Sequence, residues 1–87
     1  MYGDVFMSKF SETFEVEYFD GRKGLLEECC VYPNGSIFSK GNVNNLGIGD
    51  ILVRVQPNGY TECLRVKWIS QKASPLSGSK EIKVQEI

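Results

Sequence analysis

The stretch ILVRVQPNGYTECLRVKWI, residues 51–69, decides the fold because it places two strand-like patterns on either side of one turn. β-branched and aromatic residues are frequent in both halves, as is typical of strands. Asn-Gly is a strong signal for a two-residue hairpin loop, since these residues adopt positive φ at low cost. The stretch therefore predicts a hairpin of strands 51–55 and 60–69 that turns at Asn58 and Gly59.

The register of this hairpin decides which side chains face the core. With a two-residue loop, one face carries mostly apolar residues: Ile51, Val53, Val55, Tyr60, Glu62, Leu64, Val66 and Trp68. The other face is mostly polar: Leu52, Arg54, Gln56, Thr61, Cys63, Arg65 and Lys67. A three-residue loop shifts the pairing by one residue, sets Arg65 beside Ile51 and mixes the two sets. The pattern therefore favours the two-residue loop.

Four further strands are predicted outside this hairpin, over residues 14–19, 25–32, 36–40 and 80–87. A second Pro-Asn-Gly, at 33–35, joins two of them and indicates one turn solution used twice. Six short strands without a long helical pattern predict an all-β domain built as a small antiparallel barrel or sandwich.

The run GIGDILVRV, residues 47–55, resembles the strand led by Gly-Asp that recurs in SH3-like small barrels. The resemblance implies a barrel, SH3-like or related, and implies no function. We expect a single domain over residues 1–87, with hairpins joined in chain order and a mobile Ser-rich loop at 70–79. The first dozen residues fit either a strand extension or a short helical turn.

Composition argues against several classes of function. The chain has no histidine, so it cannot form a Ser-His-Asp or Cys-His arrangement by itself. Its three cysteines lack the paired spacing of a structural zinc site, and the Gly-rich segment 41–50 lacks both phosphate-binding glycine orders. We therefore expect no enzyme activity, no catalytic residue, no metal and no cofactor.

The cysteines and the apolar runs also indicate a compartment. An odd number of cysteines favours a reduced, cytoplasmic setting. The N-terminus lacks the pattern of a secretory signal, and no apolar run approaches the roughly 20 residues of a membrane span. We expect no membrane association.

Charge is unevenly spread along the chain. Residues 1–30 hold seven acids against three bases, a net −4, whereas residues 31–87 hold four acids against seven bases, a net +3. In the favoured register Arg54, Arg65 and Lys67 form a basic stripe with Thr61 beside it. Its two arginines lie diagonally and can reach one anion. An ordinary charged solvent face is the other interpretation of the same residues.

The leading hypothesis is a non-enzymatic protein-binding module, an adaptor, inhibitor or regulator. Its partner would be another protein, or a second copy that pairs through an exposed strand edge. Tyr32, Phe38 and Trp68 are candidate anchors for such a partner, Trp68 because it lies near the end of the apolar face. The alternative is weak binding of phosphate or single-stranded nucleic acid by the basic stripe.

Overall fold

A computed structural model describes residues 9–70, 72 and 78–87 of the 87-residue chain. This part contains one 3-10 turn, η1 (Lys9–Ser11), and six strands: β1 (Glu12–Glu17), β2 (Lys23–Tyr32), β3 (Ser36–Ser39), β4 (Ile51–Val55), β5 (Thr61–Ile69) and β6 (Lys80–Glu86). The six predicted strands are confirmed. Of the first dozen residues, for which a strand extension and a helical turn both fit the sequence, 1–8 lie outside the described part, and the rest forms η1 and the first residue of β1. The expected loop at 70–79 lies partly outside the described residues, which omit 71 and 73–77.

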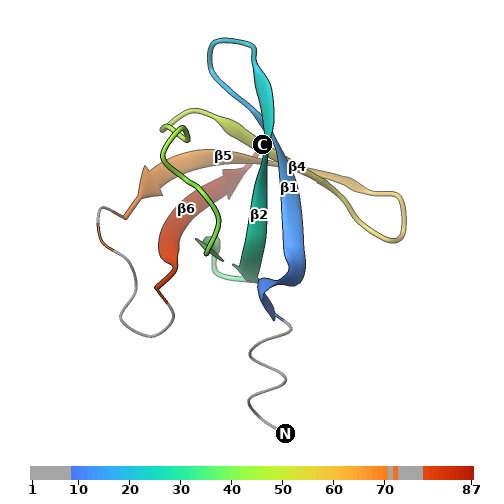
Figure 1. The fold of residues 1–87 in the computed structure, drawn as a ribbon. Helices are drawn as coiled ribbons and strands as arrows, with labels where there is room; N and C mark the ends of the chain where they lie inside the picture. Colours follow the sequence, from blue (N-terminus) through green and yellow to red (C-terminus); the bar gives the residue numbers. More distant parts are fainter. Residues whose placement is uncertain (1–8, 71, 73–77) are drawn as a thin grey trace, which may run out of the picture.

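The strands form a closed antiparallel barrel in the order β1-β2-β3-β6-β5-β4, with β4 paired back to β1 (Figure 1). Hairpins join neighbours in chain order except at β3, whose second neighbour is β6 rather than β4. Residues 40–50 carry the chain from β3 across to β4. The architecture is consistent with an SH3-like barrel, and closure gives each described strand a partner on both sides.

The core lies inside the barrel and is filled by alternate residues of the strands, since successive side chains of a strand point to opposite faces. In β1, for example, Phe14 and Val16 are buried while Glu15 and Glu17 are exposed. Burial of these apolar side chains is the main force that holds the barrel closed. The buried set is Phe14, Val16, Leu26, Cys29, Ile37, Val43, Leu52, Leu64, Val66 and Ile82.

The turn between β4 and β5 is a three-residue loop, so the predicted register is wrong by one residue. The Gly59 N–H donates to the Gln56 carbonyl (2.8 Å), and the Gln56 N–H donates to the Tyr60 carbonyl (2.8 Å). Gly59 has a φ of 87°, whereas Asn58 lacks the positive φ that a two-residue type I′ loop requires. The proline explains this choice. Its ring fixes φ near −65°, which suits the second position of a type I turn followed by a left-handed glycine.

The first Pro-Asn-Gly forms the same turn. The Gly35 N–H donates to the Tyr32 carbonyl (3.3 Å), Gly35 has a φ of 87°, and Tyr32 pairs with Ser36. In both copies the asparagine side chain accepts a hydrogen bond from the backbone N–H two residues later. One turn used twice is therefore confirmed, although its type is not the one that the sequence predicted.

The one-residue shift exchanges the inward-facing and outward-facing residues of β4 relative to the predicted register. The inward pairs are Leu52 with Leu64 and Arg54 with Glu62; the outward pairs are Ile51 with Arg65, Val53 with Cys63 and Val55 with Thr61. Leu52 is fully buried, whereas Val55 is 67% exposed. The inner side of β4 thus faces the core, and its outer side is also apolar, with Ile51 and Val53 half-buried and Val55 exposed.

A bulge in β5 turns Trp68 outward and corrects its predicted place on the inner face. The register with β6 shifts between Val66, which pairs with Val84, and Trp68, which pairs with Lys83. Trp68 is 46% exposed, while the next residue, Ile69, packs against the core. Such a bulge re-aims one side chain without ending the strand.

A buried carboxylate fixes the loop that leads into β4. Asp50 accepts hydrogen bonds from the Phe19 N–H (2.8 Å) and from the Gly47 N–H (2.7 Å). These bonds satisfy its charge in a site that is almost closed to solvent. They also tie the turn after β1 to the segment before β4. Phe19 and Ile48 are left on the surface beside this anchor.

The cysteines are free thiols placed in three environments. Cys29 lies in the core, and burial raises the pKa of its thiol to about 11. Cys30 points to the other side of β2, opposite Phe38, and is also buried. Cys63 is half-buried on the outer side of β5. The two buried thiols are therefore protected by packing, and Cys63 is the accessible one of the three.

The register predicts a large loss of stability for one truncation in β4 and a small loss for another. Leu52→Ala should lower the free energy of unfolding by about 2 to 4 kcal/mol because it leaves a cavity in the core. Val55→Ala should change it by less than about 1 kcal/mol because the side chain is mostly in solvent. Urea denaturation of both variants measures the difference. The two-residue loop would reverse the order, so a larger loss at Val55 than at Leu52 would contradict the structure.

Candidate functional site

The predicted basic stripe is not formed, because Arg54 and Arg65 lie on opposite faces of the sheet. Arg54 points inward opposite Glu62, and Arg65 points outward opposite Ile51. Thr61 and Lys67 are exposed on the outer side with Arg65, so the shift removes only Arg54 from the predicted group. The cause is the period of two in a strand, since a slip of one residue in pairing changes which residues of β4 accompany a given face of β5.

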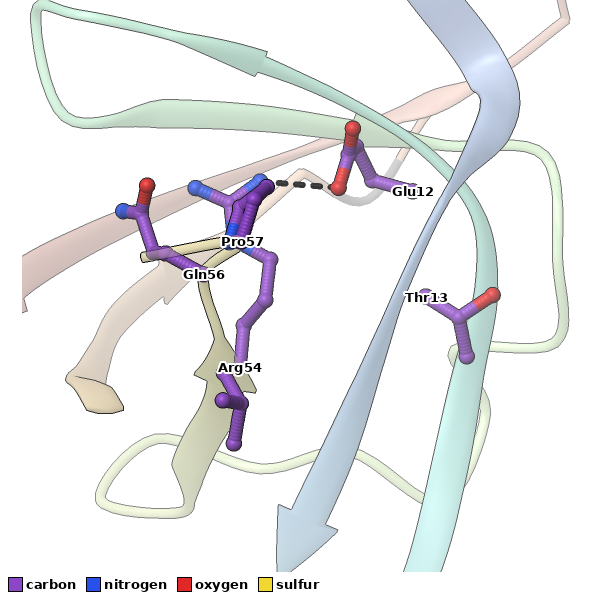
Figure 2. A pocket seen from close by; sticks show the side chains of 6 residues that line it. Glu12, Thr13, Arg54, Gln56 and Pro57 are labelled. Carbon is purple, nitrogen blue, oxygen red and sulfur yellow. Dashed lines mark hydrogen bonds and ion pairs between the residues drawn. The ribbon is translucent and has the colours of Figure 1, made fainter. Parts of the chain in front are cut away.

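Arg54 is held between two carboxylates at the end of the barrel. Its Nη1 lies 3.0 Å from Glu12 Oε1, and its Nη2 lies 2.7 Å from Glu62 Oε1. Its Nε donates a further bond to the same Glu62 oxygen (3.1 Å). Figure 2 shows the Arg54 side chain reaching from β4 toward Glu12. The group joins β1, β4 and β5 by charge-assisted hydrogen bonds.

Electrostatic interactions hold the Arg54 guanidinium against Glu62 and Glu12. Partial burial by itself lowers the pKa of Arg54, but the hydrogen bonds and charges of Glu62 and Glu12 outweigh it and raise that pKa. The guanidinium also lies 5.1 Å from the centre of the Phe14 ring. Two carboxylates against one arginine leave the group with a net negative charge. Arg54 is therefore a structural clamp and offers little to an external anion.

The cavity beside this clamp has a volume of about 390 Å³ (Figure 2). Its lining is Glu12, Thr13, Arg54, Val55, Gln56 and Pro57. The charged groups in the lining are already paired with each other, and Gln56 Nε2 lies 3.4 Å from Glu62. A ligand would have to break those bonds, so we assign no ligand to this cavity.

The aromatic candidates fall on two separate parts of the barrel. Tyr32 and Phe38 lie on β2 and β3 with their ring centres 5.4 Å apart. Trp68 lies on β5 opposite Lys83 of β6. β6 lies between β3 and β5, so Trp68 is two strands from Phe38 and three from Tyr32. Tyr32 and Phe38 are in ring contact with each other, and Trp68 is a separate exposed ring.

The nearest approach to a nucleophilic arrangement among the described residues is a group on β3 and β6. The Ser36 hydroxyl donates to Glu81 (3.0 Å), and Lys83 Nζ lies 3.4 Å from the same hydroxyl and 3.3 Å from Glu81. Ser36 is almost fully buried, so a substrate has no access to its oxygen. The group links two strands and does not resemble an active site.

Sequence reasoning missed the outward side of β4, because it placed those residues in the core. We call the outer apolar strip the set of apolar residues that this side shares with its neighbours: Leu25, Ile51, Val53, Val55, Cys63 and Ile87. Val53 pairs with Cys63 in one cross-strand row, and on the other side Glu15 of β1 separates Val53 from Leu25 of β2, since it pairs with both. The Ile87 N–H then donates to the Cys63 carbonyl (3.1 Å). Leu25, Val55 and Ile87 are each more than half exposed, whereas Ile51, Val53 and Cys63 are half-buried.

Charges of opposite sign flank the part of the strip that lies on β4. Glu15 and Glu17 project from β1, and Arg65 and Lys67 project from β5. Of these, only Glu17 has an ion pair with a described residue, an exposed contact of 3.8 Å with Lys23. Exposed pairs of this kind contribute little. The outer face of β1, β4 and β5 is therefore acidic, apolar and basic in that order.

No family model, no curated protein and no solved structure matches the chain. Within the described ranges, no group of three or more Cys, Asp or Glu residues is placed to hold a metal ion. The same ranges contain no helix with the length and apolar character needed to cross a membrane. The outer face is therefore characterised by the geometry of this chain, without a related protein for comparison.

Replacing each arginine in turn should distinguish the clamp at Arg54 from the exposed position of Arg65 on the outer face. Arg54→Ala should lower the free energy of unfolding by about 1 to 3 kcal/mol, because it leaves the half-buried Glu62 without its partner. Arg65→Ala should change it by no more than about 0.5 kcal/mol, because its side chain is exposed. Urea or thermal unfolding of the two variants gives the comparison. Equal effects would mean that both arginines share one environment, as in the predicted stripe.

Proposed function

We propose that this chain is a non-enzymatic protein-binding module, an adaptor, inhibitor or regulator of the cytoplasm, that contacts its partner through the outer face of β1, β4 and β5. One observation carries the proposal. Ile51, Val53 and Val55 face outward on a barrel whose core is filled without them. The three free thiols support a reducing compartment.

The composition of the face supports contact with protein. Contiguous exposed apolar surface is rare on small monomers and marks interaction sites. Protein interfaces combine an apolar centre with a polar or charged rim. Here the outer apolar strip supplies the centre, and the exposed carboxylates of β1 and the cations of β5 supply the rim.

The alternative of binding nucleic acid or phosphate has lost much of its support. Arg54 is committed to two carboxylates, which leaves Arg65 and Lys67 on the outer face. Two cations give only a weak, salt-sensitive contact with phosphates. Glu15 and Glu17 lie two strands away on the same face, where they would repel a polyanion. We therefore make protein contact the proposal.

A matched pair of variants tests the proposed face. Val55 on the face is 67% exposed and Ile48 in the loop before β4 is 68% exposed, so lysine should leave both folds intact. Captured from native cells at low salt, a protein bound by the wild-type chain should also be bound by Ile48→Lys. Val55→Lys should lose most of it, by tenfold or more, because a charge would be buried against the partner. Quantitative mass spectrometry of the three captures gives the ratio.

Thermal unfolding of the three chains controls for folding. A partner that Val55→Lys retains at the wild-type level would remove the outer face from the proposal. A partner that Ile48→Lys loses selectively would move the contact to the loop at 40–50.

A further inference from the structure

We infer that the occupant of the outer face is a second copy of this chain, packed face to face about a two-fold axis that lies in the contact plane and runs along β4. The inference rests on the proposed function, because it names the partner of the same face. It replaces the route through a strand edge, since each described strand of the closed barrel already has two neighbours.

The order of charges across the face makes it complementary to itself. β1 and β5 are the two immediate neighbours of β4, so the acidic and basic borders lie at equal distances on either side of the apolar centre, about 4.8 Å per strand. A heterologous partner needs only the complement of this pattern on its own surface. A second copy already carries that complement. The chain's net charge of −1 adds almost no general repulsion between copies.

Symmetry selects the direction of the axis. Rotation about an axis along β4 exchanges the two borders, so β1 of one copy lies over β5 of the other. Rotation about an axis across the strands keeps each border in place, which sets acid on acid and base on base. Like charges directly opposed across an interface are strongly unfavourable. The first arrangement also agrees with the nearly aligned packing of face-to-face sheets.

The register gives the contacts of this arrangement. Glu17, Ile51 and Arg65 are consecutive partners in one cross-strand row. An axis along β4 preserves the row, so Ile51 meets Ile51 of the second copy. Glu17 of each copy then meets Arg65 of the other, and the pair occurs twice. Arg65 has no ion pair with another described residue and is free to make this contact.

The size of the face indicates a weak dimer. The three strands of the face, spaced by about 4.8 Å, and a five-residue β4 outline an area of about 10 by 17 Å. This is below the size of stable specific interfaces, so only a weak, transient contact is expected. We therefore expect association in the micromolar range or weaker, driven by the outer apolar strip and oriented by the charges.

Sedimentation velocity of the full chain tests the inference. From roughly 1 µM to 1 mM the wild-type protein should shift from monomer to dimer, and added salt should weaken the shift by screening. Alkylation of the half-buried Cys63 should slow over the same concentrations, because the second copy covers it. Val55→Lys should stay monomeric, and Ile48→Lys should dimerise like the wild type.

Charge reversal tests the axis itself. Glu17→Lys and Arg65→Glu should each weaken dimerisation by about tenfold or more, since each sets like charges opposite one another in both contacts. An equimolar mixture of the two variants should form a heterodimer, because both of its contacts then join opposite charges. The double variant Glu17→Lys/Arg65→Glu should dimerise again for the same reason. Both residues are exposed, so folding is not at risk.

The outcomes separate this inference from the proposed function. A wild-type chain that remains monomeric at 1 mM contradicts the dimer, whereas loss of a captured protein by Val55→Lys would still support the face. A dimer that Val55→Lys leaves intact places the contact elsewhere and contradicts the inference. A dimer that fails to re-form when the two single variants are mixed contradicts the axis along β4.

Discussion

The fixed φ of proline in the Pro-Asn-Gly turns is the constraint on which the rest of the structure depends. Pro57 occupies the second position of a type I turn and leaves the left-handed position to Gly59, which has a φ of 87°. The loop therefore has three residues rather than two. This choice alone sets Leu52 against Leu64 in the core and Ile51, Val53 and Val55 toward solvent.

Two features of the molecule follow from that register. Arg54 is carried to the inner side, where Glu62 and Glu12 neutralise it and link three strands at the end of the barrel. The outer side of β4 is left apolar between an acidic and a basic strand. The interior is complete without those outer residues, so their exposure costs the barrel no buried core. A surface of this kind is available for contact with a partner.

The sequence was sufficient for the strands and insufficient for the faces. Alternation located all six strands, and their number and spacing indicated the barrel. In ILVRV, however, both alternate sets of β4 contain apolar residues, so the pattern could not decide which set lies inside. Glu62 faces inward in both registers, and only the observed register gives it a partner, Arg54, on the same side of the sheet. Arg54 also contacts Glu12, which lies 42 positions away in the chain, and a local sequence pattern does not reveal such a contact.

The bulge that exposes Trp68 was equally hidden. It depends on how β5 is paired with β6 rather than on any residue type near position 67. The turn itself carries a usable signal, because a proline precedes Asn-Gly in both copies. Asn-Gly alone predicts a two-residue loop, whereas Pro-Asn-Gly forms the three-residue loop that is observed. The proposed face was missed for this one reason.

Nuclear Overhauser contacts between the Hα protons of β4 and β5 test the register most directly. The backbone bond from Gln56 to Tyr60 makes Val53 with Cys63, and Ile51 with Arg65, the close pairs without mutual hydrogen bonds. The observed register predicts strong Hα–Hα cross-peaks for these pairs. Strong cross-peaks from Arg54 to Cys63 and from Leu52 to Arg65, the close pairs of a two-residue loop, would contradict it and would return the outer apolar strip to the core.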